Sequence, residues 1–304
     1  MKVDLYLMSA KGLRVLQSSI ASGFSPLINQ VCIGRDSGVI NDFSSEIRDL
    51  CAISGVSWRY RDQPNTLPDS DYSIAISWRW LLRDVPNLIV IHDSLLPRYR
   101  GFAPLVSQLV NGDNEIGVTA IWAKDEYDTG DIIAQSSIPI DYPIKIADAI
   151  DRIGVCYDEC ILPLLRTISS KARIVSTPQD ESAATYSLWR DTDDYWINWH
   201  DNAEKITRFV DAVGTPYKGA LSLCVGTLVT INQVKVLPDV TIENRSPGKV
   251  LKIEDGYPVV VCGSGLIMIT DAVDTNTHTS IIPLKSFRSR FYAKSAYTSH
   301  APVS

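Results

Sequence analysis

Two polar residues, His92 and Asp128, have the types and surroundings that proton-transfer chemistry requires. His92 closes the apolar run Leu88–Ile91, which predicts a buried parallel strand, and chemistry in open α/β sheets lies beyond the carboxyl ends of such strands. Asp128 stands 36 residues later, in an acidic loop after a second apolar stretch, Gly117–Trp122. Two neighbouring strands that end in these residues can place a carboxylate beside an imidazole, which fixes the ring tautomer and raises its basicity. The pair therefore predicts an enzyme.

Each residue also has an ordinary explanation. A single histidine at a strand end is more often structural than catalytic, and Asp-Thr-Gly-Asp at residues 128–131 is good turn chemistry before the next predicted strand. Of the four histidines, however, only His92 lies between a buried strand and a turn-rich loop. The combination of His92 with Asp128 favours the catalytic interpretation.

Composition limits the class of protein. With 304 residues, 45% of them apolar, the chain can bury a sizeable core, and no apolar run reaches the ~20 residues that span a bilayer. The six cysteines form no CxxC pair, which predicts buried free thiols and a reducing cytoplasm. Cys156 and Cys160 share a helix face without a second ligand pair nearby, so no metal is expected. Residues 205–304 carry 11 basic against 7 acidic groups and residues 1–204 carry 18 against 28, a balance untypical of a dedicated nucleic-acid binder.

The order of predicted elements indicates two domains. Strands alternate with helices up to about residue 170, which predicts an α/β fold with a doubly wound, mostly parallel sheet. Residues 171–185 contain few large apolar groups and are predicted to be a linker. A helix at 202–213 and then short strands with turn signals predict a small, OB-like β-barrel. We therefore expect a catalytic domain with its linker at 1–185 and a helix-plus-barrel domain at 186–304. No G-x-G-x-x-G follows the first strand, so a dinucleotide site loses its main support.

These residues resemble the formyltransferase family that uses 10-formyltetrahydrofolate, over nearly the whole chain. Ile91–Gly101 matches its His-x-Ser-Leu-Leu-Pro-x-x-x-Gly signature, and Asp125–Ile133 matches its Asp-x-Gly loop. Residues 246–267 are similar to the C-terminal barrel of methionyl-tRNA formyltransferases. Residues 186–190 and 213–219 are most similar to bacterial enzymes that formylate amino sugars on nucleotide carriers.

The resemblance implies transfer of a formyl group from 10-formyltetrahydrofolate to the primary amine of an amino sugar linked to UDP or dTDP, for cell-surface glycans. His92 would carry protons while Asp128 holds its ring. The Leu96–Pro97 bond is expected to be cis, as in relatives. The residues implied for the folate are Trp78, Arg79, Trp80, Leu82, Asp125 and Tyr127. Core packing is the alternative explanation for the two tryptophans.

An acceptor pocket is expected between the two domains, since a diphosphate needs cations and an aromatic ring can stack on a base. Its predicted lining is Arg98, Tyr99, Arg100, Tyr186, Trp189, Arg190 and Lys218. The alternative is that Trp189 is core and that Arg98 and Arg100 are solvated loop residues. Transfer-RNA formyltransferases carry a basic loop after the second strand, whereas residues 34–42 here hold one arginine and two aspartates. No nucleic acid and no membrane are therefore expected as partners, and a homodimer is compatible with the sequence.

One position departs from the family pattern. The family usually has an asparagine two residues before the histidine, where this chain has Val90. That asparagine donates a hydrogen bond to the formyl oxygen, and losing one such donor costs about 10²–10³ in rate in other enzymes. Either a backbone N–H or protonated His92 substitutes, or the chain is a catalytically weak protein that binds folate or a sugar nucleotide. Methionyl-tRNA formylation stays as the alternative activity.

Overall fold

The computed structural model describes residues 1–67, 70–82, 84–284 and 286–294. The chain divides into two compact units. The first comprises Met1–Leu105, Asn114–Ile140 and Asp148–Leu188, and the second consists mainly of the chain from Trp189 onward. The predicted domain boundary after residue 185 stays a prediction. Among the described residues, no helix has the length and apolar character needed to cross a membrane.

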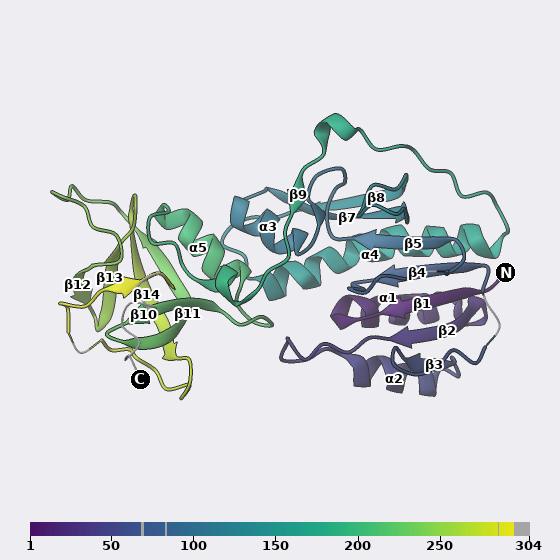
Figure 1. Ribbon diagram of the computed structural model, residues 1–304, viewed down its shortest axis with the longest axis horizontal. Helices are drawn as coiled ribbons and strands as arrows, with labels where there is room; N and C mark the ends of the chain where they lie inside the picture. The colour runs from purple at the N-terminus through teal and green to yellow at the C-terminus, as the bar shows by residue number, and fades with distance from the viewer. Residues whose placement is uncertain (68–69, 83, 285, 295–304) are drawn as a thin grey trace. The chain divides into compact units, whose positions relative to one another are not determined.

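The first unit is built on a seven-stranded sheet with the order β3-β2-β1-β4-β5-β7-β8 (Figure 1). Its strands are β1 (Val3–Leu7), β2 (Ile28–Ile33), β3 (Trp58–Tyr60), β4 (Tyr72–Ile76), β5 (Leu88–His92), β7 (Glu115–Trp122) and β8 (Ile132–Pro139). The first five strands are parallel. The direction of winding changes between β1 and β4, so a crevice is expected beyond the carboxyl ends of these strands. The predicted mostly parallel α/β fold is confirmed.

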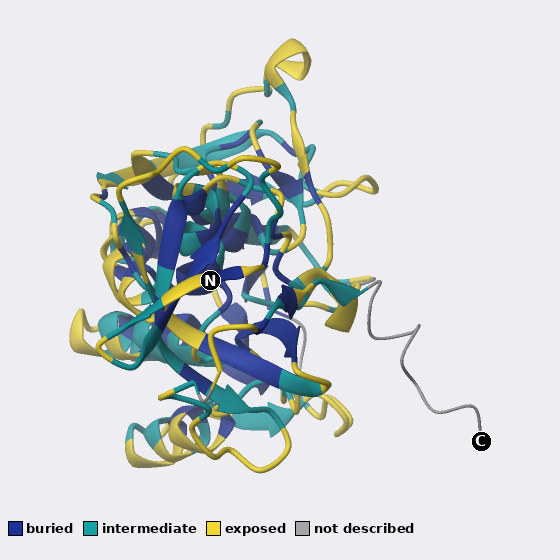
Figure 2. Ribbon diagram, turned by 90° about the vertical axis from the view of Figure 1, so that its left-hand side faces the viewer, coloured by how far each residue is buried: buried dark blue, intermediate teal, exposed yellow. Residues whose placement is uncertain are grey.

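Helices α1 (Ser9–Ala21), α2 (Ser44–Ile53) and α4 (Ile146–Ser169) lie along the sheet (Figure 1). Arg14 of α1 bonds Asp158 of α4 at 2.7 Å, so these two helices are neighbours. β1 is buried along its whole length, as Figure 2 shows for the central strands. Each fully buried aliphatic side chain stabilises the fold by roughly 1.5–3 kcal/mol, so this core fixes the strand ends that carry the site.

Strand β7 runs antiparallel to β5, with Ile89 opposite Trp122 and His92 opposite Thr119. Its carboxyl end therefore lies level with the start of β5, whereas the sequence predicted that both strands end at one edge. The end of β7 is therefore distant from His92. The loop 123–131 runs back along the sheet and places Asp128 beside His92 at the end of β5. The structure brings the side chains of His92 and Asp128 together, by a different route from the one that the sequence suggested, and their catalytic role stays a prediction.

The segment 171–188 is more structured than a linker. Thr177 forms a bridge with Ile132, a 3₁₀ turn covers Glu181–Ala183, and β9 (Tyr186–Ser187) pairs in parallel with β6 (Arg100–Gly101). In Figure 1 this segment is the extended teal stretch between α4 and β9. It thus reaches the loop that follows His92.

The second unit contains helix α5 (Ala203–Ala212), α3 (Pro104–Asn111, most of whose residues belong here) and a six-stranded antiparallel sheet in the order β12-β13-β14-β11-β10-β15. These strands are β10 (Ala220–Cys224), β11 (Thr227–Leu237), β12 (Val250–Glu254), β13 (Tyr257–Val261), β14 (Leu266–Asp274) and β15 (Phe291–Tyr292). An isolated bridge pairs Lys249 with Arg290, the residues just before the edge strands β12 and β15. The predicted barrel-like domain is confirmed as an antiparallel half-barrel sheet.

Candidate active site

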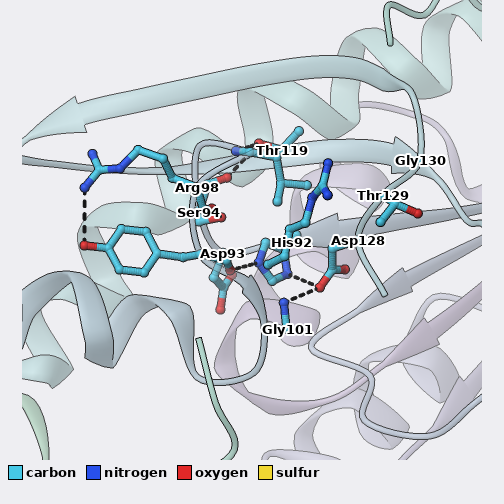
Figure 3. A network of polar contacts seen from close by, with 12 residues as sticks. His92, Asp93, Ser94, Arg98, Gly101, Thr119, Asp128, Thr129 and Gly130 are labelled. Carbon is cyan, nitrogen blue, oxygen red and sulfur yellow. Dashed lines mark hydrogen bonds and ion pairs between the residues drawn. The ribbon is translucent and has the colours of Figure 1, made fainter. Parts of the chain in front are cut away.

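His92 is buried at the end of β5, and both of its ring nitrogens face acceptors (Figure 3). Nε2 lies 2.8 Å from the carbonyl oxygen of Tyr99, which can only accept, so Nε2 carries the ring proton. Nδ1 lies 3.5 Å from Oδ2 of Asp128. Nδ1 is thus the nitrogen that can take up and return a proton, and the carboxylate stabilises the resulting cation.

Asp128 is held from two sides. Its Oδ2 accepts a hydrogen bond of 2.8 Å from the N–H of Gly101, and Figure 3 shows this contact beside the imidazole. Gly101 has φ +99°, and a Cβ there would meet the Ser187 carbonyl oxygen at 2.5 Å, so only glycine fits. The side chain of Gln179 donates to the backbone carbonyl of Asp128 at 2.7 Å.

Val90 stands on the same face of β5 as His92, because side chains two apart share a face. It packs against a cluster of Tyr6, Cys32 and Ala75, to which Trp78 and Leu82 also belong. An apolar contact therefore occupies the place where the family pattern has an asparagine. The Val90 side chain carries no N–H or O–H group that could donate to a formyl oxygen.

The residues predicted to bind folate have different surroundings. Trp78 is half-buried against the rings of Tyr6 at 5.3 Å and Trp80 at 5.1 Å, and Leu82 shares its cluster. Arg79 bonds Asp36, and the Arg61 guanidinium lies 4.3 Å from the ring of Trp80. Asp125 and Tyr127 are exposed beside Asp128, where the Tyr127 ring packs on Phe102 at 5.5 Å. Their roles with folate stay predictions.

The residues predicted for the acceptor divide between the two units. Arg98 is exposed in the first unit, where it lies 5.0 Å from the Tyr99 ring, and Tyr186 is exposed on β9 opposite Arg100. In the second unit, Trp189 is exposed, while Arg190 bonds the Asp194 carbonyl and Lys218 bonds Thr192, both at 3.4 Å. The predicted pocket between the domains stays a prediction.

Tyr99 and Arg100 are buried and take part in the structure of the loop. Arg100 is only 1% exposed, and its guanidinium makes four hydrogen bonds, to the side chains of Gln179 and Glu181. The bond to Glu181 raises the pKa of Arg100. The guanidinium of Arg100 therefore bonds side chains of the protein, whereas the sequence predicted that it contacts a diphosphate. Sequence reasoning missed Gln179 and Glu181 because a polar stretch carries no periodic signal.

A buried charged cluster lies next to His92. The carboxylate of Asp93 accepts hydrogen bonds from Lys11 of α1 and from the hydroxyl of Tyr157 of α4. Burial raises the pKa of Tyr157 well above its ordinary value, and the charge of Asp93 adds to the effect. The cluster joins the end of β5 to two helices and was not predicted from the sequence, although Asp93 stands inside the signature motif.

The cysteines and the other residue types that could bind a metal form no further candidate site among the described residues. All six cysteines are free and buried, and burial raises the pKa of Cys160 to about 12. Cys156 and Cys160 lie on the buried face of α4, where a thiol is poorly ionised and therefore poorly reactive. Across the described ranges, no group of three or more His, Cys, Asp or Glu residues is placed to hold a metal ion.

The fold and the site define an α/β catalytic domain with a histidine–aspartate pair at the end of a central strand, joined to an antiparallel half-barrel. A family model described as "Formyl transferase" matches residues 74–153, and one described as "Formyl transferase, C-terminal domain" matches residues 190–280. The chain belongs to the formyl transferase family, whose enzymes transfer formyl groups.

Several proteins are similar to this chain, one in sequence and two in structure. A methionyl-tRNA formyltransferase of Ralstonia pickettii is 27% identical over 258 residues, which are 84% of this chain and 75% of that protein. WlaRD, a sugar 3N-formyl transferase solved with dTDP and 5-N-formyl-THF, has a TM-score of 0.66 at 17% identity and covers 88% and 96% of the two chains. HypX from Aquifex aeolicus, solved with tetrahydrofolic acid, has a TM-score of 0.59 at 20% identity. The match covers 93% of this chain and 45% of HypX.

Proposed function

We propose that the protein transfers the formyl group of 10-formyltetrahydrofolate to the primary amine of a nucleotide-linked amino sugar. In this reaction a bond forms between the amine nitrogen and the formyl carbon, and the bond from that carbon to the folate nitrogen breaks. The amine loses one proton and the folate nitrogen gains one. The single proton-exchanging nitrogen of His92, held beside Asp128 at 3.5 Å, suits this traffic and carries the proposal.

Protonated His92 is the proposed donor to the oxyanion that forms on the formyl oxygen. Val90 packs in an apolar cluster and supplies no donor, whereas a protonated Nδ1 directs an N–H out of the ring beside Asp128. Asp128 would stabilise the imidazolium during that step. This accounts for activity without the asparagine of the family pattern.

The loop 34–42 favours a sugar nucleotide over tRNA. Its only arginine, Arg35, lies 3.6 Å from the ring centroid of Tyr60, and its two carboxylates are those of Asp36 and Asp42. Phosphate contacts from Lys and Arg supply most nucleic-acid affinity, and this loop offers few. Solved relatives with dTDP support the same acceptor class. Arg98, Tyr186, Trp189, Arg190 and Lys218 remain the proposed acceptor ligands.

Methionyl-tRNA is the second candidate acceptor, because the Ralstonia pickettii relative matches 84% of the chain. The test is turnover of purified protein with 10-formyltetrahydrofolate and a panel of UDP- and dTDP-linked amino sugars, in parallel with charged initiator tRNA. Mass spectrometry should detect a formamide on one or more of the sugars, and His92→Ala should form it at least about a hundredfold more slowly. Formylation of tRNA alone would overturn the sugar assignment, and folate binding without any product would favour a binding protein.

A further inference from the structure

The two residues that contact the ring of His92 both have left-handed backbone conformations. Tyr99, whose carbonyl accepts from Nε2, has φ +60°, and Asp128 has φ +55°. Residues other than glycine seldom have a positive φ, and they keep it only where the surrounding structure fixes it. The geometry of His92 therefore depends on whatever holds these two residues.

One short segment, 179–185, holds both of them. The hydroxyl of Thr185 accepts from the backbone N–H of Tyr99 at 2.9 Å. The amide nitrogen of Gln179 donates to the carbonyls of Asp128 and Gly130, each at 2.7 Å. Each strained residue thus has a hydrogen bond to a side chain of the same segment.

Arg100 fixes the orientation of this segment. Its Nε and Nη2 donate to Oε1 of Gln179 at 3.1 and 2.8 Å, and its Nη1 and Nη2 donate to the two carboxylate oxygens of Glu181, both at 2.7 Å. Because a guanidinium has donors only, it selects the oxygen of the Gln179 amide and turns the NH₂ group toward Asp128. The backbone N–H of Arg100 also donates to the Thr185 carbonyl at 2.8 Å.

We propose that Gln179, Glu181 and Thr185, here called the clasp, are positioning residues. Thr185 and Gln179 hold Tyr99 and Asp128 against His92, and Glu181 together with Arg100 fixes the orientation of Gln179. The hydrogen bonds of the clasp described above go to Arg100, Tyr99, Asp128 and Gly130, so we assign it a positioning role. Its role in the rate rests on the proposed formyl transfer, whereas its effect on the imidazole does not.

The first test measures the ring of His92 directly. Thr185→Val keeps the side-chain shape and removes the hydroxyl, and Gln179→Leu removes both amide contacts at similar volume. Ser182→Ala is the matched control, because that hydroxyl bonds Asp180 at 2.7 Å within the same segment. In ¹⁵N spectra of histidine-labelled protein, with His92 assigned from the His92→Gln spectrum, both clasp variants should shift the His92 ring signals and the control should not.

The second test measures turnover of the same variants, with circular dichroism to show that each is folded. Misplacing a catalytic group by about 1 Å costs about a hundredfold in rate, so kcat should fall by about 10–100-fold while KM changes by less than about threefold. Glu181→Gln should fall between these variants and the control.

The two tests separate this inference from the proposed function. Unchanged His92 signals in folded Thr185→Val and Gln179→Leu, or unchanged kcat in both, would overturn the clasp. Shifted signals in a protein whose unmodified form makes no formamide would support the clasp and overturn the proposed function.

Discussion

Removing one member of the Lys11–Asp93–Tyr157 cluster should lower the free energy of unfolding by several kcal/mol, about 3–5 for Asp93. Replacing Lys11 and Asp93 together by apolar residues should lower it much less. The side chains of Lys11 and Asp93 are 10% and 16% exposed, and Tyr157 is fully buried. A unit charge pair at ~4 Å with an effective dielectric constant of ~20 is worth about 4 kcal/mol. Asp93→Asn removes the carboxylate charge that Asp93 supplies to the Lys11 ammonium, and removing one partner of a buried pair costs about 3–5 kcal/mol. Tyr157→Phe loses one hydrogen bond to a carboxylate, which should cost about 1–3 kcal/mol.

Urea unfolding, followed by circular dichroism and tryptophan fluorescence, measures these losses. With slopes of about 1–3 kcal/mol per molar urea, a loss of about 3–5 kcal/mol in Asp93→Asn should lower the midpoint by about 1–5 M. The control is the double variant Lys11→Met with Asp93→Leu, which removes both charges together and should lose far less stability than Asp93→Asn. A loss below about 1 kcal/mol for Asp93→Asn, or an equal loss for the double variant, would refute this account of the cluster.

The remaining predictions concern the catalytic pair, Val90 and the thiols. His92→Ala and Asp128→Ala should each lower kcat by about 10²–10⁴, with the double variant barely worse; near-normal steady-state turnover in either would remove the pair from catalysis. Val90→Asn should change kcat by less than about tenfold and cost about 1–3 kcal/mol in urea unfolding, because an amide enters an apolar cluster; a rise in kcat beyond that would show that the missing donor limits the enzyme. Burial raises the pKa of Cys32 to about 11 and that of Cys51 to about 12, so few of these thiols are ionised at pH 8. Because alkylating reagents react with the thiolate, they should label the native protein at pH 8 far more slowly than the unfolded one. Above pH 9 the thiol of Cys32 ionises in the unfolded chain but stays protonated in the folded one, so ionisation favours unfolding. The urea midpoint should therefore fall as the pH rises from 9 toward 11. A constant midpoint over this range would contradict the effect of burial on the thiol pKa.

Local patterns predicted much of this protein because the forces behind them act over short distances. Apolar runs of four to eight residues predicted most of the long strands to within a few residues at either end, since burial of a strand depends on its own side chains. Asp-Gly at residues 255–256 is a residue pair typical of a two-residue hairpin turn, and both residues have the positive φ that such a turn requires. His92 and Asp128 were predicted together because the signature residues around each are contiguous in sequence.

Tertiary structure alone decided how those parts meet. β3, β6, β9 and β15 contain two or three residues each, too few to form a pattern. β15 nevertheless pairs with β10 at the edge of the second sheet, and β9 pairs with the loop after His92. No local signal shows that β7 runs antiparallel, so the return of Asp128 through the loop 123–131 was not foreseen. Arg100 meets Gln179 and Glu181 across 79 and 81 residues. A polar side chain has no periodicity that reveals so distant a partner, because its partner is chosen by the packing of the whole unit.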